Sequence, residues 1–443
     1  MKDELRTPPP VTGLPVLGNL WEYFRYPEPL LRRGYRELGP IFSLRLGPRR
    51  AAVLIGPDYH RFFFRETDRC LSLAATFQWL RPMFGNRFPL ALQGLPHLTD
   101  RPVLQRPLRG QSLVSYADDF IEQTKRWLDT LADRGEFELI ETFRRLTLLN
   151  ATRLFLGHET CAGREEEVMG LINDIALEAS DHALRRFRVQ LPRVKRFRSK
   201  RRLHEIARQT IDERRSIGSC GVDYLQALME ASAESGSIPN ADIINLAAGM
   251  IWGGHATLWG HLSWALIQLL QHPDYLQTVM QEQWKVFGPA GGMRPDKLAE
   301  LHHLDWALRE TERMRPPVIV MGRLTVESYE LGGYRVPRGW LTLVAPPVAH
   351  RLPEIFSNPD SYDPYRFGPG RQEDKRHPYG LIGFGSGTHR CIGEDLAMLE
   401  MKLILSMLLQ RFHLQLKHPG PERKPGPDPN RPKAPVTIGY EKR

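Results

Sequence analysis

Residues 384–393 read Phe384-Gly385-Ser-Gly387-Thr-His389-Arg-Cys391-Ile-Gly393, and the apolar segment Glu394–Leu405 follows directly. The pattern predicts a helix that begins just after the cysteine, where free backbone amides and the helix dipole stabilise a thiolate. The glycines let the backbone turn sharply around the sulfur and approach a flat ligand closely. A thiolate held in this way suits haem iron, because sulfur donation favours cleavage of the O–O bond.

Phe384, Gly387, Cys391 and Gly393 match the pattern Phe-x-x-Gly-x-x-x-Cys-x-Gly. The segment therefore resembles the haem loop of the cytochrome P450 family. The resemblance implies a mainly α fold with small β-sheets, in which the haem lies between a long central helix and the cysteine loop with its helix. It also implies haem b (iron protoporphyrin IX) as the cofactor, with Cys391 as the metal ligand. The loop residues expected around the haem are Phe384, Gly385, His389 and Gly393.

The chain has 443 residues, is 41% hydrophobic and 25% charged, and shows no repeat or flexible linker. We expect one domain over residues 1–443, with an extended Pro-rich lead-in at 1–19 and a Pro-rich loop and strand at 420–443. The first residues contain no apolar stretch near the roughly 20 residues of a membrane span. We therefore expect no transmembrane anchor and a cytoplasmic location. The four cysteines are far apart, which argues against a disulfide framework or a zinc cluster.

The segments Ile41–Leu46 and Ala51–Ile55 predict a β-hairpin. From about residue 115 to 285 the helical period dominates, and short strand-like segments return after residue 328. The net charge of +10 indicates an acidic partner. A basic run at 185–202 is interpreted as a solvated surface, with a membrane-touching or partner-docking patch as the alternative. Because no nucleic-acid-binding motif accompanies it, we expect no nucleic-acid partner.

Glu310 and Arg313 are three residues apart on one face of a predicted helix. Alone, they would form a surface ion pair that stabilises little. The segment Pro364-Tyr-Arg366-Phe367 resembles the family loop whose arginine joins such a pair. The resemblance therefore implies a buried structural network of Glu310, Arg313 and Arg366 that holds the core under the haem.

The apolar segment from Asn240 to Leu270 predicts a long central helix with Asn240 as its N-cap. The paired glycines 253 and 254 lie within it, and each destabilises the helix by about 1 kcal/mol relative to alanine. The family resemblance places Gly253, Gly254 and Thr257 over the iron, where small residues leave room for dioxygen. Thr257 and water are then the expected source of protons. The candidate catalytic residues of this segment are Thr257, Gly254 and His255.

Ala256 stands where most family members carry Asp or Glu, and where the sterol 14α-demethylases carry His. A methyl group cannot relay a proton. His255 lies about 100° around the helix from it and cannot simply replace the missing group. We therefore favour a hydrogen-bonded wall residue over a catalytic role for His255. The alternative explanation of Ala256 is that it makes space for a bulky substrate.

Haem propionates need cationic or hydrogen-bonding partners. His389 and Arg323 match family positions for this task, and His97 and Arg101 have the His-x-x-x-Arg spacing of many bacterial relatives. The proline that follows Arg101 disfavours a helix there unless the helix begins near residue 99.

Within the family, the chain is most similar to the bacterial sterol 14α-demethylases. This similarity rests on Phe77–Gly85, on Arg313–Arg323 and on the order Arg371-Gln-Glu-Asp374 before the haem loop. Phe77 stands where those enzymes have tyrosine, and Ala256 where they have histidine. Both departures argue against sterol demethylation as the reaction.

The resemblance implies a monooxygenase that inserts one atom of dioxygen into a lipophilic substrate of sterol-like, terpenoid or fatty type. Because no flavin or nicotinamide domain follows the haem loop, we expect electrons from a ferredoxin or flavodoxin with an NAD(P)H-dependent reductase. The alternatives are a haem-thiolate isomerase or dehydratase acting on a peroxide without a reductase, and a haem-binding sensor without turnover. The expected walls of the substrate cavity are Phe77, Leu80, Met250, His255, Ala256, Val318 and Val320.

Overall fold

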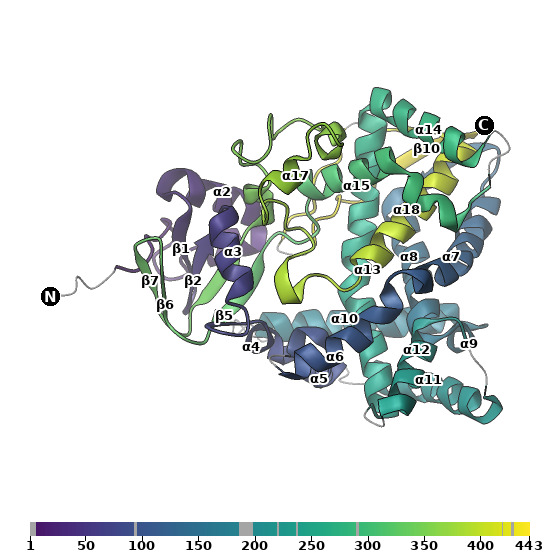
Figure 1. Cartoon of the computed structure of the whole chain (residues 1–443), viewed down its shortest axis with the longest axis horizontal. Coiled ribbons are helices and arrows are strands. Elements are labelled where there is room, and N and C mark those ends of the chain that lie inside the picture. The colour runs from purple at the N-terminus through teal and green to yellow at the C-terminus, as the bar shows by residue number, and fades with distance from the viewer. Residues whose placement is uncertain are drawn as a thin grey trace.

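The computed structural model describes residues 6–92, 95–185, 198–218, 221–235, 238–288, 292–418, 420–426 and 429–443. Its largest sheet lies at the end of the molecule from which the N-terminus leaves, and long helices make up the other end (Figure 1). This is the mainly α architecture with small sheets that the sequence predicts.

The largest sheet has five strands in the order β1-β2-β8-β5-β3. Its first two strands form the predicted hairpin, in which Ile41 pairs with Leu54. A three-stranded sheet, β4-β10-β9, and a two-stranded one, β6-β7, complete the set. The strands are β1 (Ile41–Leu46), β2 (Arg49–Leu54), β3 (Leu71–Ser72), β4 (Arg134–Glu138), β5 (Met321–Thr325), β6 (Tyr329–Leu331), β7 (Tyr334–Val336), β8 (Leu341–Val344), β9 (Phe412–Leu416) and β10 (Thr437–Lys442).

The helices fall into two groups: shorter ones, and a second group of mostly longer helices that pack against one another and include the four-residue α9. The first group is α1 (Leu20–Arg25), α2 (Pro27–Leu38), α3 (Pro57–Arg65), α4 (Leu73–Phe77), α5 (Arg81–Phe84), α6 (Leu95–Gln105), α16 (Pro346–Ala349) and α17 (Glu373–Arg376). The second is α7 (Gln111–Asp129), α8 (Leu139–Leu156), α9 (His158–Cys161), α10 (Glu165–Arg185), α11 (Arg198–Ile217), α12 (Tyr224–Ser235), α13 (Asn240–Gln271), α14 (Pro273–Phe287), α15 (His302–Met314) and α18 (Glu394–Arg411).

The central helix α13 has 32 residues and is about 48 Å long at 1.5 Å per residue. It crosses the helical part of the molecule from one side to the other (Figure 1). Because it is apolar on nearly all sides, neighbouring helices cover both of its ends, and Ile243 and Leu269 are each 0% exposed. Asn240 is its first residue, and Pro239 occupies the N-cap position that the sequence assigned to Asn240.

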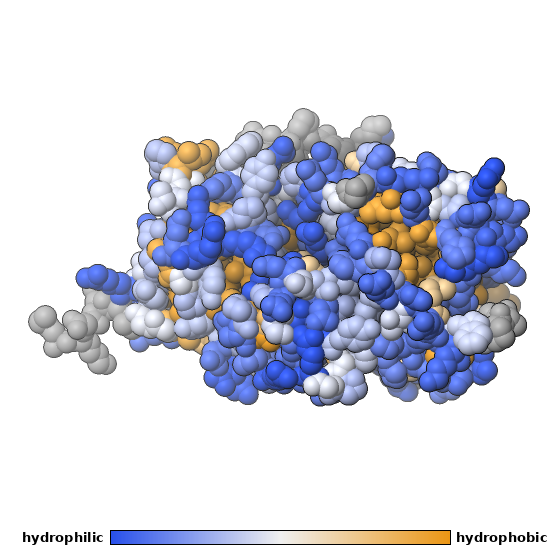
Figure 2. Space-filling view, turned by 90° about the horizontal axis from the view of Figure 1, so that it is seen from above, coloured by the Kyte–Doolittle hydropathy of each residue, from blue (hydrophilic) through white to orange (hydrophobic). Residues whose placement is uncertain are grey.

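Two further expectations from the sequence concern the helix around Arg101 and the basic run. The helix α6 begins at Leu95, well before residue 99, so Pro102 lies inside it. Residues 186–197 of the basic run lie outside the described residues. No described helix is long and apolar enough to cross a membrane. The face shown in Figure 2 is mostly hydrophilic, with separate apolar areas, one of them at the end that carries the N-terminal elements.

Candidate active site

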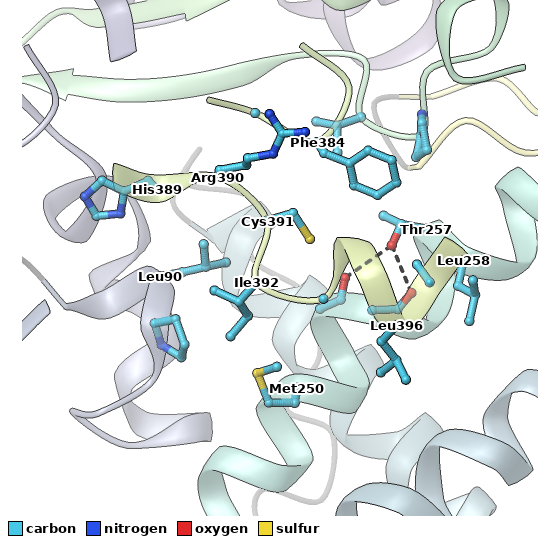
Figure 3. A pocket seen from close by; sticks show the side chains of 18 of the residues that line it. Leu90, Met250, Thr257, Leu258, Phe384, His389, Arg390, Cys391, Ile392 and Leu396 are labelled. Atoms are coloured by element: carbon cyan, nitrogen blue, oxygen red, sulfur yellow. Dashed lines mark hydrogen bonds between the residues drawn. The ribbon is translucent and has the colours of Figure 1, made fainter. Parts of the chain in front are cut away.

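A cavity of about 380 Å³ lies between α13, the Cys391 loop and β5. The thiol of Cys391 points into the space that Phe384 and Thr257 also border (Figure 3). The structure therefore gathers most of the predicted site residues around one cavity. Those that line it are Phe77, Arg101, Met250, Gly254, His255, Thr257, Val318, Val320, Arg323, Phe384, Gly385, His389, Cys391 and Gly393.

Two predicted residues, Leu80 and Ala256, do not line the cavity. Leu80 is 0% exposed and packs into the hydrophobic core. Ala256 is half-buried and does not line the cavity. The residues of α13 that line the cavity are Gly249, Met250, Gly253, Gly254, His255, Thr257, Leu258 and His261. The side chain of His97 lies outside the described residues.

The Cys391 loop is held by a backbone hydrogen bond from the Cys391 N–H to the Phe384 carbonyl, at 2.8 Å. Gly385 and Gly387 have φ of +73° and +67°, where a side chain would be strained. The loop thus turns back on itself and presents the Cys391 side chain, which is exposed to the cavity.

The start of α18 does not by itself make this thiol a thiolate. Burial raises the pKa of Cys391 to about 11, although the Gly393 N–H and the guanidinium groups of Arg101 and Arg390 lower it. Removal of the sulfur from bulk water outweighs the amides and the helix dipole. A bound metal ion favours the deprotonated form of a coordinating thiol.

On the opposite wall, α13 leaves open space. A methyl group added at Gly253 or Gly254 would meet no atom within 4 Å. One turn later, the Thr257 hydroxyl donates to the Gly254 carbonyl at 2.9 Å (Figure 3). The mid-helix glycines thus produce a gap beside the threonine, as the sequence predicts.

The two histidines of this wall are engaged with protein atoms. Nε2 of His255 lies 2.8 Å from the Arg144 carbonyl, and Nε2 of His261 lies 2.9 Å from the Leu308 carbonyl. Burial lowers the pKa of each to about 4, although the hydrogen bond to the carbonyl raises it. Both rings are therefore neutral donors near pH 7, and His255 has the geometry of a hydrogen-bonded wall residue.

The predicted propionate partners form a polar rim on the sheet side of the cavity. Arg323 is 5% exposed and donates to Thr67 and to the Gly322 carbonyl, at 3.3 and 2.9 Å. Burial lowers its pKa to about 10, although Asp68 raises it. Nε2 of His389 lies 2.7 Å from Asp68, a partner that the sequence did not indicate.

These residues fit a haem. Arg101 donates to the Arg390 carbonyl, and within the described part of the chain neither Arg101 nor Arg323 forms an ion pair with a carboxylate. The buried guanidinium of Arg323 requires an anion; haem propionates would supply one, and the half-buried Arg101 could share it. The cavity-facing thiol of Cys391 and the gap at Gly253 and Gly254 provide the ligand and the open face that the iron needs.

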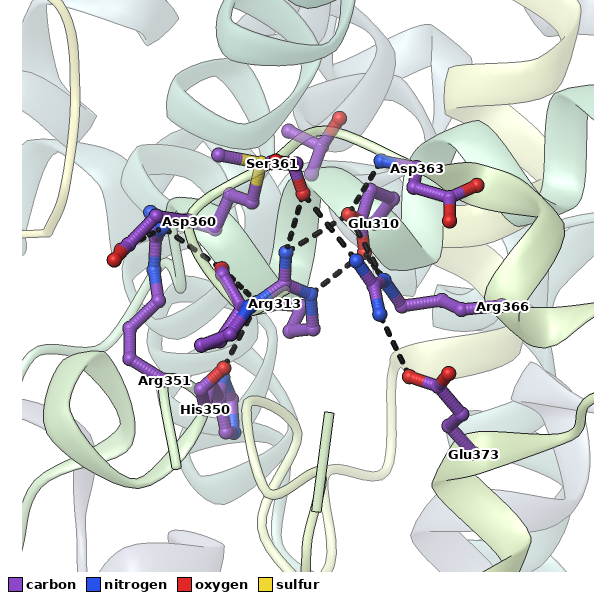
Figure 4. A network of polar contacts seen from close by, with 12 residues as sticks. Glu310, Arg313, His350, Arg351, Asp360, Ser361, Asp363, Arg366 and Glu373 are labelled. Carbon is purple, nitrogen blue, oxygen red and sulfur yellow. Dashed lines mark hydrogen bonds and ion pairs between the residues drawn. The ribbon is translucent and has the colours of Figure 1, made fainter. Parts of the chain in front are cut away.

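Away from the cavity, the structure brings Glu310, Arg313 and Arg366 together, with all three side chains 0% exposed. Arg313 donates to both carboxylate oxygens of Glu310, at 2.7 and 2.8 Å, and Arg366 donates to Glu310 at 3.1 Å (Figure 4). Sequence reasoning missed Glu373, which accepts from Arg366 at 2.6 Å. No local pattern distinguishes Glu373 from its acidic neighbour in the chain.

Phe88 and Glu400 are cavity residues that sequence reasoning also missed. A methyl group at Gly249 would lie 2.7 Å from the Phe88 ring, so this glycine lets the ring pack on α13. Glu400 is 2% exposed and accepts from Asn150 at 2.8 Å. Burial raises its pKa to about 8, although that bond lowers it. Each contact joins distant segments of the chain. Only Gly249, a glycine inside a helix, could have signalled one of them in the sequence.

Comparisons with known proteins bear on this arrangement. The chain is 30% identical to an obtusifoliol 14-alpha demethylase of Triticum aestivum, with 94% of each chain covered. It is 27% identical to a sterol 14alpha-demethylase of Mycolicibacterium vanbaalenii, with 91% of this chain and 90% of the relative covered. The expected similarity to bacterial sterol 14α-demethylases is thus confirmed. Retinoic acid-bound cyanobacterial CYP120A1 has the same fold, with a TM-score of 0.88 over 100% of both chains at 24% identity.

The sequence model of the cytochrome P450 family matches residues 8–435. That range contains the whole cavity, including the cysteine that faces it and the glycine-lined helix opposite. This chain therefore belongs to the cytochrome P450 family, as a haem monooxygenase that binds haem b through a cysteine thiolate.

Proposed function

We propose that the substrate is a largely uncharged sterol-like, terpenoid or fatty molecule, which would lie on the Thr257 side of the cavity while Cys391 on the opposite wall would hold the haem. The observation that carries this proposal is the apolar wall of the cavity beside α13. Apolar walls select substrates by shape and by removal of apolar surface from water. The residues of that wall include Phe77, Phe88, Leu90, Met250, Val318 and Val320.

The polar groups of α13 add little that could anchor a charged substrate. His255 and His261 donate to backbone carbonyls, and Thr257 donates to its own helix. A carboxylate or sulfate placed there would lose its water without gaining an equivalent partner, which is costly.

The relatives support the same class. The two demethylases named above act on sterols or on obtusifoliol by their names. Phe77 and Ala256 depart from the sterol demethylase pattern, so we propose the lipophilic class and not demethylation.

Each residue then has a defined task. The haem, when bound, supplies the iron chemistry that activates dioxygen. Cys391 provides the thiolate, Arg101 and Arg323 compensate the propionate charge, and the gap at Gly253 and Gly254 keeps the reacting face open. Thr257 holds water beside that face, since its oxygen can still accept hydrogen bonds while its proton is donated.

For electrons, we propose an acidic ferredoxin or flavodoxin with its NAD(P)H-dependent reductase. Arg109 and Arg390 are 51% and 49% exposed beside the Cys391 loop and α18. Because each of them also pairs with a carboxylate, Asp395 and Glu394 respectively, the proposal rests on the net charge of +10, since complementary charge speeds the association of an acidic protein.

A haem-thiolate isomerase or dehydratase remains the second candidate. The observation that favours it is the lack of any titratable side chain at Ala256, together with the engagement of His255 elsewhere. Consumption of an organic peroxide without NAD(P)H, at a rate equal to or above the reductase-driven rate, would favour this candidate.

The substrate class is tested with pairs of ligands that share one carbon skeleton, such as a sterol and its sulfate. The readout is the high-spin shift of the Soret band in the haem-loaded protein. We expect the neutral member to bind at least about ten-fold more tightly, a difference of about 1.4 kcal/mol. Met250→Ala should weaken binding, whereas Met280→Ala, at a half-buried methionine of the same core away from the cavity, should not. Equal or tighter binding of the charged member contradicts the proposal.

A further inference from the structure

Five large apolar or aromatic side chains are exposed within one short segment near the start of the described chain. They are Leu14 (53% exposed), Val16 (75%), Leu17 (47%), Trp21 (63%) and Tyr26 (50%). Single exposed apolar residues are ordinary, but a cluster marks contact with another molecule. We call Leu14, Val16, Leu17 and Trp21 the apolar tip. It belongs to the N-terminal end of the molecule, where Figure 2 also shows exposed apolar surface.

The tip is held in its exposed position. Leu14 and Gly18 exchange two backbone hydrogen bonds of 2.9 Å, which close the turn that carries Val16 and Leu17. Gly18 has φ +61°, and a methyl group there would lie 2.4 Å from the Arg45 carbonyl. Asn19, 0% exposed, donates to the Thr12 carbonyl and accepts from the Arg45 N–H, both at 3.1 Å. These contacts stop the apolar side chains from folding back onto the protein.

Cations surround the tip. Arg45 is exposed and donates to the Pro15 carbonyl at 3.2 Å. Arg50 lies opposite Arg45 in the β1–β2 pair, so both side chains leave the same face of the sheet. Arg25 is exposed at the end of α1, with its guanidinium 5.9 Å from the Tyr26 ring. In the described chain, no ion pair with a carboxylate is formed by any of these three arginines.

Two carboxylates of α1 and α2 already form ion pairs with arginines. Glu22 pairs with Arg33 at 2.8 Å, and Glu28 pairs with Arg32 at 3.0 Å. The area around the tip therefore combines exposed apolar side chains with uncompensated positive charge.

We propose that the apolar tip inserts into the interfacial region of a lipid bilayer that contains anionic headgroups, with Arg25, Arg45 and Arg50 at the headgroup level. A projecting turn needs no complementary pocket in a bilayer, as it would in a protein partner. Trp21 and Tyr26 are residue types that favour the membrane–water interface. Arginine attraction to anionic lipid supplies the second signal that reversible surface binding requires.

This contact would place the enzyme where lipophilic molecules concentrate. The tip is bonded to β1, and β5 of the same sheet contributes Met321, Gly322 and Arg323 to the cavity lining. The membrane contact does not depend on which substrate the cavity takes, so its failure would leave the proposed substrate class intact.

The test is co-sedimentation of the full-length haem-loaded protein with two kinds of vesicle, phosphatidylcholine alone and phosphatidylcholine mixed with phosphatidylglycerol. The apolar variant is Val16→Ser with Leu17→Ser and Trp21→Ala, and Val16→Ser alone serves as a milder version. The matched control is Leu177→Ser with Trp284→Ala, which removes side chains 69% and 65% exposed elsewhere. Far-ultraviolet circular dichroism and the Soret band check that each variant is folded.

We expect wild-type protein to bind the anionic vesicles. The apolar variant should bind them with a partition coefficient at least about ten-fold lower than that of the wild type. The control should bind like wild type. Arg25→Gln with Arg50→Gln, or raised salt, should weaken binding only to the anionic vesicles. Quenching of tryptophan fluorescence by brominated lipid should fall in Trp21→Phe.

Three results would overturn the proposal. One is that wild-type protein stays in the supernatant with both vesicles. The second is that the apolar variant and the control lose binding equally. The third is self-association of the wild type, abolished by the apolar variant, without vesicle binding, which would assign the tip to a second copy of the chain.

Discussion

Position 256 carries only a methyl group, and this sets what can deliver protons beside Thr257. Ala256 does not line the cavity, which argues against the alternative explanation that it makes space for a bulky substrate. His255 points its Nε2 at the Arg144 carbonyl. We therefore propose that proton delivery on this wall depends on the Thr257 hydroxyl and on water bound to it.

We expect Thr257→Ala to lower the rate of product formation by about 10²-fold, the lower end of the range for a positioned proton-transfer group. Reducing equivalents should appear as hydrogen peroxide instead. Thr257→Ser, which keeps the hydroxyl, is the control. The measurement is NADPH consumed, peroxide formed and product made. Unchanged coupling in Thr257→Ala would remove this residue from the mechanism.

At the scale of the element, α13 contains glycines that serve opposite purposes. Gly253 and Gly254 face open space, whereas a methyl group at Gly260 would lie 2.9 Å from the Asn430 carbonyl. Asn430 also accepts from the Trp264 indole N–H at 3.2 Å, and its own N–H donates to the Pro317 carbonyl at 2.8 Å. Gly260 thus lets the C-terminal segment pack on the helix.

The same Gly→Ala change should therefore have opposite effects at two sites of one helix. Gly253→Ala should raise the free energy of unfolding by about 0.5–1 kcal/mol, because alanine favours the helix, while the carbon monoxide affinity of the reduced protein falls. Gly260→Ala should lower the free energy of unfolding by about 1–3 kcal/mol, as an overpacked core does. Denaturant unfolding measures the two stability changes, and carbon monoxide titration measures the ligand affinity. Equal stability changes at the two sites would contradict the conclusion that Gly253 faces open space while Gly260 packs against the C-terminal segment.

At the scale of the whole molecule, the network of Glu310, Arg313 and Arg366 joins α15 to the segment before the haem loop. Arg313 also donates to the His350 and Pro359 carbonyls, at 2.9 and 2.7 Å (Figure 4). Several loops without regular structure thus share one buried guanidinium.

Removal of that guanidinium in Arg313→Ala leaves the Glu310 carboxylate buried with less compensation, which typically costs about 3–5 kcal/mol. We expect little haem-loaded protein to be recovered. The control on the same helix is Arg309→Ala, which breaks an ion pair to Asp305 from a side chain 42% exposed, worth about 1 kcal/mol or less. Yield, haem content and unfolding free energy should all fall further in Arg313→Ala than in Arg309→Ala. Equal losses would mean that the buried network stabilises the protein no more than the exposed ion pair does.

Buried histidines should make the stability of the molecule sensitive to acid. His350 is 0% exposed, and its Nε2 accepts from the Ile382 N–H at 2.9 Å. Burial and the nearby Arg313 lower its pKa to about 3 from 6.5. Between pH 6.5 and about 3, the imidazole of His350 is therefore protonated in the unfolded chain and neutral in the folded protein.

Stability from His350 should thus be fully present above pH 6.5 and fall as the pH drops towards 3, by up to about 1.4 kcal/mol per pH unit. His350→Gln, whose amide can still accept from the Ile382 N–H, should flatten the pH dependence of unfolding by that amount between pH 6 and 4. Urea unfolding at several pH values measures it. An unchanged slope would show that His350 is protonated in the folded protein.

The haem loop, the long apolar helix with its paired glycines, and the Glu310–Arg313 pair could all be predicted from the sequence. Each depends on local spacing: a cysteine before a helix start, a period of 3.6 residues, or two charges three residues apart. Backbone geometry converts such spacings into positions with no knowledge of the rest of the chain, and the resemblance to the family added their purpose.

Other features depended on the tertiary structure, because they join segments far apart in the chain. The bond of His255 to Arg144 and that of His389 to Asp68 are of this kind. So is the place of Ala256, which follows from the rotation of α13 about its own axis. The sequence by itself determined which chemistry this protein can carry, since that chemistry lies in short local patterns. Only packing decided which side chains reach the cavity and which are held by other protein atoms, because burial and hydrogen-bond partners exist only once distant segments meet.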